Sequence, residues 1–191
     1  SGAISPSLFC SALSDMSDKK TDQEILMEQA AQALQAALER LLVPFDADRF
    51  AWEDILAREY KEHTGDARGM GWRGIKRYGL GRPPFIPAQF ALRYFEIESG
   101  GYSSLEKHRH VHLIIVIRGR GKALVGTRVF DLKPFDLLYV PPDTPHRWMN
   151  PYDQPFGFLC PVDAERDRPQ PLSDTEWEAL RQNPETAPWV F

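Results

Sequence analysis

Gly100-Gly-Tyr-Ser-Ser-Leu-Glu-Lys-His-Arg-His-Val-His-Leu-Ile-Ile-Val-Ile-Arg-Gly119 is the stretch on which the interpretation of this 191-residue chain depends. It places four side chains that can bind a metal, Glu106 and three histidines, within seven residues. Side chains two apart on a strand point to the same face, so an extended backbone would direct the whole set to one side. The apolar run that follows, residues 113–117, indicates a buried strand.

The alternative for any single histidine is a surface or hydrogen-bonded residue, which is commoner than a metal ligand. These histidines are not isolated, because His108, His110 and His112 alternate beside Glu106. Burial would penalise such polar groups unless they were paired or bound to a metal. The stretch therefore predicts a metal site on one wall of a barrel.

The composition excludes several classes of protein. A hydrophobic content of 42% and a charged content of 26% are typical of a globular protein. The net charge of −4 argues against a nucleic-acid partner, which requires a concentrated basic surface. No apolar run approaches the roughly 18 residues of a membrane helix, so no membrane partner is expected. The absence of a secretory pattern at the start, together with only two cysteines, predicts a cytoplasmic protein without a disulfide framework.

The chain before residue 90 has a helical pattern. Thr21 and Glu24 form a capping box, which predicts a helix to about Leu42 with one apolar face. A second helix is predicted over residues 48–63, ending before Gly65. Residues 64–89 are rich in glycine and proline and are predicted to be connecting structure.

From residue 90 onward, short β-type runs alternate with Gly, Pro and Asp, as in a β-sandwich or barrel. Ser173 and Glu176 form another capping box, which predicts a short C-terminal helix that packs on the barrel or on a partner subunit. The expected organisation is a flexible segment over 1–20, a helical extension and loop over 21–89, the barrel over 90–162, and a helix and tail over 163–191. The expected strands lie near 90–98, 104–111, 113–118, 121–126, 128–132, 136–140, 145–149 and 155–161.

A motif in the second half of the barrel region suggests a family. Phe135, Pro141, Asp143, His146 and Asn150 keep the spacing Gly, five residues, Pro, one, Gly, two, His, three, Asn, with both glycines replaced. This resembles the second motif of the cupin superfamily. The resemblance implies a mainly β fold, a cupin-type jelly-roll β-barrel with a metal at its centre, preceded here by two α-helices and followed by a short C-terminal helix.

The first cupin motif is also matched in spacing, from Gly100 to Gly119, but with its residue types exchanged. The family has two His positions and then a Glu, whereas this chain has Glu106 and His108 at the His positions and His112 at the Glu position. With the second motif, the resemblance implies Glu106, His108, His112 and His146 as metal ligands.

A competing alignment takes His108 and His110 as the histidine pair of the family. It leaves His112 too close behind to serve as the third ligand after a turn, and the run to Gly119 two residues short. We therefore keep His110 as a substitute ligand or as a nearby acid or base.

Three imidazoles and one carboxylate suit a divalent first-row metal, Fe, Mn, Ni, Zn or Cu, and the ligand types do not choose among these ions. The absence of a cysteine cluster argues against a closed structural zinc site. His110 and Tyr139 are the predicted catalytic residues. The predicted pocket residues are Arg93, Tyr102, Trp148 and Cys160. Residues of these types more often belong to the core or the rim of a barrel than act as catalysts.

Three functions follow from the resemblance. The first is an oxidoreductase of the dioxygenase type that acts on a small organic substrate, because such enzymes are frequent among cupins. The second is a non-redox isomerase or lyase, in which the metal polarises a carbonyl while His110 or Tyr139 moves a proton. The third is a non-catalytic module that binds a small molecule. The resemblance also implies a homodimer.

Overall fold

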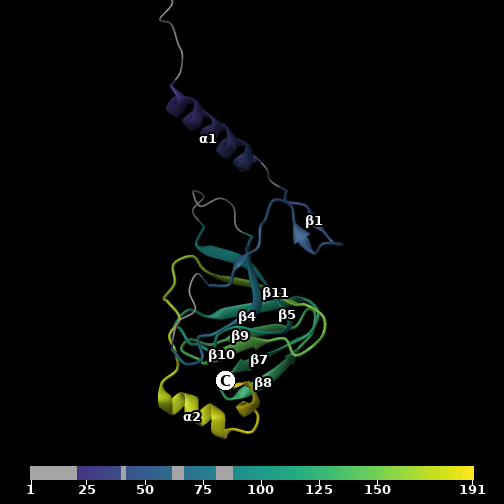
Figure 1. Cartoon of the computed structure of the whole chain (residues 1–191), viewed down its shortest axis with the longest axis vertical. Coiled ribbons are helices and arrows are strands. Elements are labelled where there is room, and N and C mark those ends of the chain that lie inside the picture. Colours follow the sequence, from purple (N-terminus) through teal and green to yellow (C-terminus); the bar gives the residue numbers. More distant parts are fainter. Residues whose placement is uncertain (1–20, 40–41, 62–66, 81–87) are drawn as a thin grey trace, which may run out of the picture. The chain divides into compact units, whose positions relative to one another are not determined.

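The computed structural model describes residues 21–39, 42–61, 67–80 and 88–191 (Figure 1). The chain divides into two compact units, Ser1–Phe50 and Ala51–Phe191. The first contains α1 (Asp22–Glu39) and the short strand β1 (Phe45–Asp46). The second contains every residue of the predicted site.

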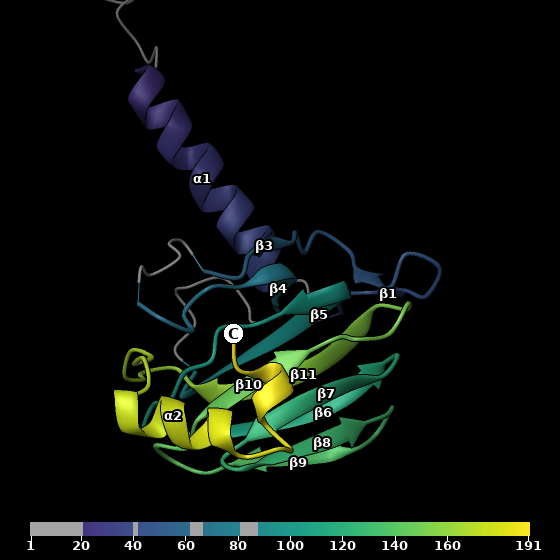
Figure 2. The same cartoon turned by 60° about the horizontal axis from the view of Figure 1, so that its bottom comes forward.

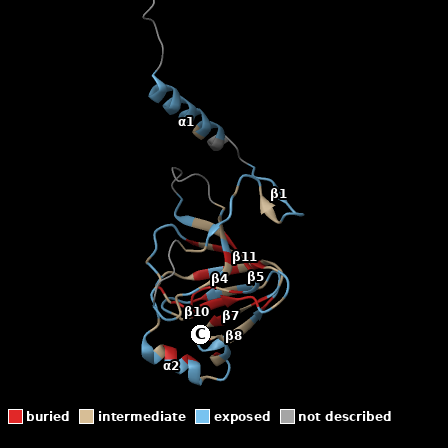
Figure 3. Ribbon diagram, in the orientation of Figure 1, coloured by how far each residue is buried: buried red, intermediate tan, exposed pale blue. Residues whose placement is uncertain are grey.

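Helix α1 confirms the first predicted helix and its cap. The Thr21 N–H donates to Glu24 Oε2 at 2.8 Å, and the Glu24 N–H donates to Thr21 Oγ1 at 3.3 Å. These are the two reciprocal bonds of a capping box. The apolar side chains Leu26 and Met27 are 67% and 66% exposed, and Figure 3 shows α1 as largely exposed.

The second predicted helix, residues 48–63, is wrong over its described part, 48–61. Asp46 Oδ1 accepts the N–H groups of Asp48 and Arg49, each at 3.0 Å, which forms a turn where the helix was expected to begin. Phe50 has a φ of 50°, outside the right-handed helical region. The helical spacing of the apolar side chains in residues 48–61 was therefore misleading. Residues 62 and 63 of the predicted helix lie outside the described residues.

The second unit is built on a curled antiparallel sheet with the strand order β8-β7-β10-β5-β11-β6-β9 (Figure 2). Strand β4 adds to β5, and β3 adds to β4. The strands of this sheet are β3 (Arg58–Glu59), β4 (Arg73–Gly79), β5 (Phe90–Tyr102), β6 (His112–Arg118), β7 (Gly121–Val125), β8 (Arg128–Leu132), β9 (Leu137–Val140), β10 (His146–Met149) and β11 (Phe156–Asp163). The short strand β2 (Ala51–Trp52) is not part of it. The mainly β fold class predicted from the sequence is thus confirmed.

The two faces of this sheet carry separate clusters of buried side chains. The inner face is lined by aromatic and aliphatic side chains that include Phe95, Trp148 and Phe158. On the other face, α2 (Asp174–Gln182) packs through Trp177 and Leu180, which are 4% and 3% exposed. The predicted C-terminal helix and its Ser173 capping box are therefore confirmed, and Figure 2 shows α2 and the short helix η2 (Ala187–Trp189) beside the strands.

Strand β4 lies within residues 64–89, which were predicted to be connecting structure. It pairs with β5 from the Arg73–Tyr102 position to the Gly79–Arg93 position. Two glycines and three cationic side chains within its seven residues hide the alternation that normally indicates a strand. Part of the predicted extension is thus sheet.

The strand predicted over 104–111 is also wrong, although the other barrel strands are confirmed. Only single bridges form here, Glu106 with His146 and Lys107 with Gln170. The chain bends after them because the Asp167 carboxylate accepts the backbone N–H groups of Arg109 and His110, at 2.7 and 3.0 Å. The histidines are therefore arranged by a bend and not by the alternation of a strand.

The glycine positions of both predicted motifs have left-handed backbone conformations. Gly100 and Gly119 have φ values of 69° and 60°. Phe135 and Asp143, which replace the glycines of the second motif, have φ values of 72° and 55°. Non-glycine residues rarely adopt this region, so the backbone of the motif is kept although its glycines are not.

Candidate metal centre

A short bridge joins the two motifs at the centre of the barrel. The Glu106 N–H donates to the His146 carbonyl at 3.1 Å, and the His146 N–H donates to the Glu106 carbonyl at 2.9 Å. This pairing brings residues that are 40 positions apart to the same place. The ligand that the second motif supplies therefore lies beside those of the first.

The rings of His108 and His112 point their outer nitrogens at each other. His108 Nε2 and His112 Nε2 are 3.0 Å apart. Two nitrogens bound about 2.1 Å from one metal ion, at roughly a right angle, would be about 3 Å apart. The spacing therefore fits two adjacent ligands of a single ion.

The opposite edges of these rings are held by hydrogen bonds. His108 Nδ1 lies 2.7 Å from the His110 carbonyl, and His146 Nδ1 lies 2.9 Å from the Thr144 carbonyl. A carbonyl only accepts, so these Nδ1 atoms donate, and the Nε2 atoms of both neutral rings carry lone pairs. Histidines that bind metals are oriented in this way. His112 Nδ1 has a sulfur partner instead, Cys160 Sγ at 3.2 Å.

The cluster is buried, and its histidines are held in the neutral form. Glu106, His108, His112 and His146 are 4%, 3%, 8% and 2% exposed. Burial, followed by the neighbouring His146 and His110, lowers the pKa of His108 to about 4. Burial is also the largest cause of the lowered pKa values of His112 and His146. Neutral imidazole is the form that binds a metal.

Two overlapping groups in this cluster bring their ligand atoms within 4.8 Å of one another. One is Glu106, His108 and His146, and the other is His108, His110 and His112. His108 belongs to both. The structure thus brings together all four predicted ligands and places His110 next to them.

His110 is oriented by an aspartate. Its ring stacks on that of His108 with centroids 3.5 Å apart, and its Nδ1 lies 2.8 Å from Asp167 Oδ1. The backbone N–H of Arg109 and the side chain of His110 lower the pKa of the Asp167 carboxyl well below its ordinary value. An ionised Asp167 fixes the donor at Nδ1, so both roles predicted for His110, substitute ligand or acid–base group, use Nε2.

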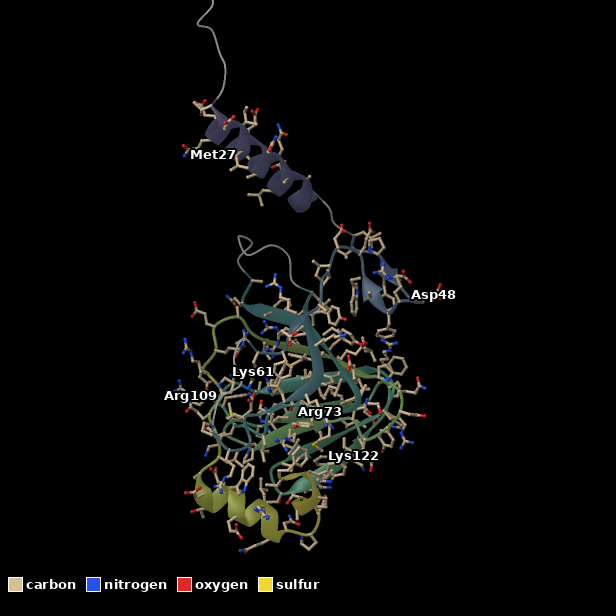
Figure 4. All side chains as sticks on the ribbon, viewed as in Figure 1. Met27, Asp48, Lys61, Arg73, Arg109 and Lys122 are labelled. Atoms are coloured by element: carbon tan, nitrogen blue, oxygen red, sulfur yellow. The ribbon has the colours of Figure 1, made fainter. Side chains whose placement is uncertain are left out.

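Glu106 has partners that the sequence did not reveal. Its Oε2 accepts a hydrogen bond from Ser104 Oγ at 2.5 Å and forms an ion pair with Lys61 Nζ. Lys61 is labelled in Figure 4. Lys61 Nζ also donates to Ser104 Oγ at 2.8 Å. Lys61 and Asp167 come from segments outside the predicted barrel, and no local pattern marks them. Only Ser104, two residues before Glu106, was accessible to sequence reasoning.

Three of the predicted pocket residues lie on the inner face near the cluster. Trp148 is 4% exposed, and its ring centroid lies 6.0 Å from that of His112 and 5.9 Å from that of His146. Cys160 Sγ contacts His112, as above, and also lies 3.4 Å from Arg93 Nη2. Burial raises the pKa of the Cys160 thiol, which favours its neutral form.

The structure does not bring Tyr139 and Tyr102 to the cluster. Tyr139 is 53% exposed and lies opposite Leu113, the neighbour of His112, so it projects from the other face of the sheet. Tyr102 packs in the outer cluster and lines a separate cavity of about 330 Å³ with Arg73 and Phe191. Both predictions assumed inward-facing positions, and the register of the strands places these residues outside.

A curled β-sheet carries a buried cluster of histidines and a carboxylate on its inner face, which is a candidate metal site in a β-barrel. The family model named Cupin_2, described as a cupin domain, matches residues 93–162. The chain belongs to the cupin superfamily. Within the described residues, no helix is long and apolar enough to cross a membrane.

Similar proteins extend this finding beyond the matched domain. The chain is 35% identical over 147 residues to the 1-methylthio-D-xylulose 5-phosphate methylsulfurylase of Rhodospirillum rubrum, which covers 77% of this chain and 90% of that protein. A cupin 2 conserved barrel domain protein from Rhodopseudomonas palustris is 34% identical, with a TM-score of 0.67 and coverage of 78% and 98%. A cupin-2 domain structure from Rhodospirillum rubrum is 34% identical, with a TM-score of 0.64 and coverage of 79% and 97%.

Proposed function

We propose that this protein is a metal-dependent cupin enzyme that acts on a small phosphorylated keto sugar with a methylthio group on the carbon next to its carbonyl. The observation that carries the metal dependence is the pair of Nε2 atoms, of His108 and His112, that face each other at 3.0 Å. The 35% identity to a methylsulfurylase supports the substrate class.

Glu106, His108, His112 and His146 would hold the ion. When bound, a divalent ion supplies a Lewis acid that polarises the substrate carbonyl. The ligand set fits Fe, Mn, Ni, Zn and Cu alike. Ser104 and Lys61 orient the Glu106 carboxylate, and the barrel wall at Trp148 keeps water away from the buried cluster.

His110 is the residue that would move a proton. Replacement of the carbon–sulfur bond by a carbon–hydrogen bond leaves an electron pair on carbon, which takes up a proton. A thiol co-reactant balances this step, because R–CO–CH2–SCH3 and R′SH give R–CO–CH3 and CH3S–SR′. With Asp167 bound at Nδ1, His110 Nε2 would accept the proton of the thiol and pass it to that carbon.

The experiment follows methyl ketone formation by NMR, with the methylthio keto sugar phosphate, a thiol and metal-loaded protein. His110→Gln should lower kcat by about 10²- to 10⁴-fold, as expected for loss of an acid–base group. Tyr139→Phe is the matched control and should keep the wild-type rate, because Tyr139 projects from the other face. An inactive wild-type enzyme loaded with each of the five metals would refute the proposed substrate class.

A dioxygenase-type oxidation, the first function predicted from the resemblance, is the second candidate. It is favoured by the number of ligands, since the four side chains would leave two positions open on a six-coordinate ion. Substrate-dependent oxygen uptake by the Fe(II) form would support it. Equal turnover under strict anaerobiosis would exclude it.

Two further expectations stay proposals. The predicted homodimer is tested by light scattering on the full chain, where a single-chain mass of 21.8 kDa would contradict it. The predicted cytoplasmic location is tested by fractionation of the native host cells.

A further inference from the structure

Arg93 is a cation on the inner face of the barrel that has no acidic partner among the described residues. Its Nη2 lies 3.4 Å from Cys160 Sγ, its guanidinium lies 5.0 Å from the centre of the Phe95 ring, and its buried Nε has no hydrogen-bond partner. Neighbouring cations differ, since Lys61 pairs with Glu106 and Arg118 pairs with Glu96.

The position of Arg93 relates it directly to the metal centre. Arg93 on β5 lies opposite Cys160 on β11, and Cys160 Sγ lies 3.2 Å from His112 Nδ1. A single sulfur atom therefore separates the guanidinium from the ring of a predicted ligand. Arg93 therefore lies beside the Nδ1 edge of His112, one imidazole ring away from the Nε2 atom that faces His108.

Two further arginines add positive charge on this side. Arg77 on β4 lies opposite Phe95, which places it diagonally from Arg93 on the same face, with Cβ atoms about 7 Å apart. Arg166 follows β11, and partial burial, then repulsion from Arg93 and Arg77, lower its pKa. Arg93, Arg77 and Arg166 are thus close enough to interact electrostatically.

A partly buried guanidinium without a counter-charge is costly unless an anion completes it. Its planar fork matches the oxygens of a phosphate group, which accepts two parallel hydrogen bonds. We propose that Arg93, supported by Arg77 and Arg166, is the anion subsite of the metal centre and binds the phosphate monoester end of the substrate. The identity of that substrate rests on the proposed function, whereas the anion subsite rests on the geometry of Arg93.

The test measures binding by calorimetry to the metal-loaded full chain with three probes, inorganic phosphate, D-xylulose 5-phosphate and D-xylulose. Arg93→Gln should weaken both phosphate-bearing probes by about 10- to 100-fold, as expected for loss of charge-assisted hydrogen bonds. Arg93→Lys keeps the charge but loses the fork, so it should restore part of this affinity. D-Xylulose should bind equally to all variants.

Arg128→Gln is a matched control. Like Arg93 with Phe95, Arg128 stacks on the phenylalanine two residues later in its strand, with its guanidinium 4.7 Å from the centre of the Phe130 ring. Unlike Arg93, Arg128 is exposed. Its replacement should leave the affinity for every probe unchanged. Thermal melts check folding, and removal of an unpaired charge from Arg93 should not lower the melting temperature.

The outcomes separate the two proposals. Phosphate that binds the wild type and Arg93→Gln equally, or fails to bind the wild type at millimolar concentration, overturns the anion subsite. The same holds if Arg93→Gln weakens D-xylulose as much as D-xylulose 5-phosphate. Arg93-dependent binding of phosphate by a protein that does not convert the methylthio sugar keeps the subsite and refutes only the proposed function.

Discussion

Two buried polar centres lie back to back on strand β10. His146 faces the inner cluster, and Arg147, the next residue, faces the opposite side of the sheet. Both are almost completely buried, at 2% and 1% exposed. The two centres differ in which groups bind their polar atoms.

The protein itself supplies partners for both terminal nitrogens of Arg147, while its buried Nε has none. Its Nη1 donates to the Trp189 carbonyl at 2.9 Å, and its Nη2 donates to the Gly69 carbonyl at 3.2 Å. Its guanidinium also stacks on Phe191 and Tyr102, at 4.5 and 5.3 Å from the ring centres. Burial lowers the pKa of Arg147 to about 10, so it remains charged at neutral pH. This centre is structural.

The inner cluster is arranged differently: Lys61 and Ser104 hold Glu106, while the Nε2 atoms of His108 and His112 lie against each other. The Nε2 lone pairs of His108 and His146 are directed inward by carbonyl groups behind their rings. The comparison shows that burial alone does not identify a functional group. The inner cluster differs because it gathers histidine and carboxylate atoms that could hold a metal ion within 4.8 Å of one another.

The largest expected effect is on the free energy of unfolding and comes from the replacement of Arg147. Arg147→Met should lower the free energy of unfolding by at least about 3 kcal/mol, because it leaves buried carbonyl acceptors without a donor. Urea unfolding measures this, with Arg120→Met, an exposed arginine, as the control. The folded fraction of the variant should keep the wild-type metal content. Loss of metal with unchanged stability would reverse the roles assigned to the two faces.

A pH series on metal-free protein sharpens the same comparison. The pKa of His108 is about 4 in the folded protein against an ordinary value of 6.5, so the unfolded chain binds more protons between these values. Stability should therefore fall as pH decreases through this window, by up to about 1.4 kcal/mol per pH unit for each such histidine. The slope should become shallower in His108→Gln. An equal slope in that variant would show that other groups cause the loss.

The smallest expected effect concerns the backbone that carries the second motif. Phe135 is 84% exposed and has a φ of 72°, so its side chain gains little from burial while its backbone is strained. Phe135→Gly should raise the free energy of unfolding by up to about 1 kcal/mol. Thermal unfolding measures it, with Phe90→Gly, exposed on β5 and expected to be destabilising, as the control. A lower free energy of unfolding in Phe135→Gly than in the wild type would contradict the backbone strain at Phe135.

The spacing of the two motifs predicted the fold, because a turn of fixed length requires a left-handed residue at a fixed position. The ligand set that this spacing implies stays a prediction. The conformations of Phe135 and Asp143 show that this requirement survives the loss of glycine. The sequence did not predict how the histidines are arranged, because the bend at His108 depends on Asp167, which lies 58 residues after Arg109. Lys61 was missed for the same reason, since only the folded chain brings it to Glu106.

The alternation of side chains along a strand was a weaker guide to which face of the sheet a residue occupies. It placed Trp148 correctly beside His146, because both lie on β10 with regular alternation. The alternation gave no support for Tyr139, and the face that this residue occupies on β9 depends on the pairing of β9 with β6, which no local pattern fixes.

Metal analysis of protein purified without added metal tests the central claim most directly. The wild type and the exposed control Tyr139→Phe should each carry about one divalent first-row ion per chain, because the predicted ligands form two overlapping groups that share His108. His108→Ala, His112→Ala and His146→Ala should each lose it while remaining folded. Full retention of metal in all three variants would contradict the account.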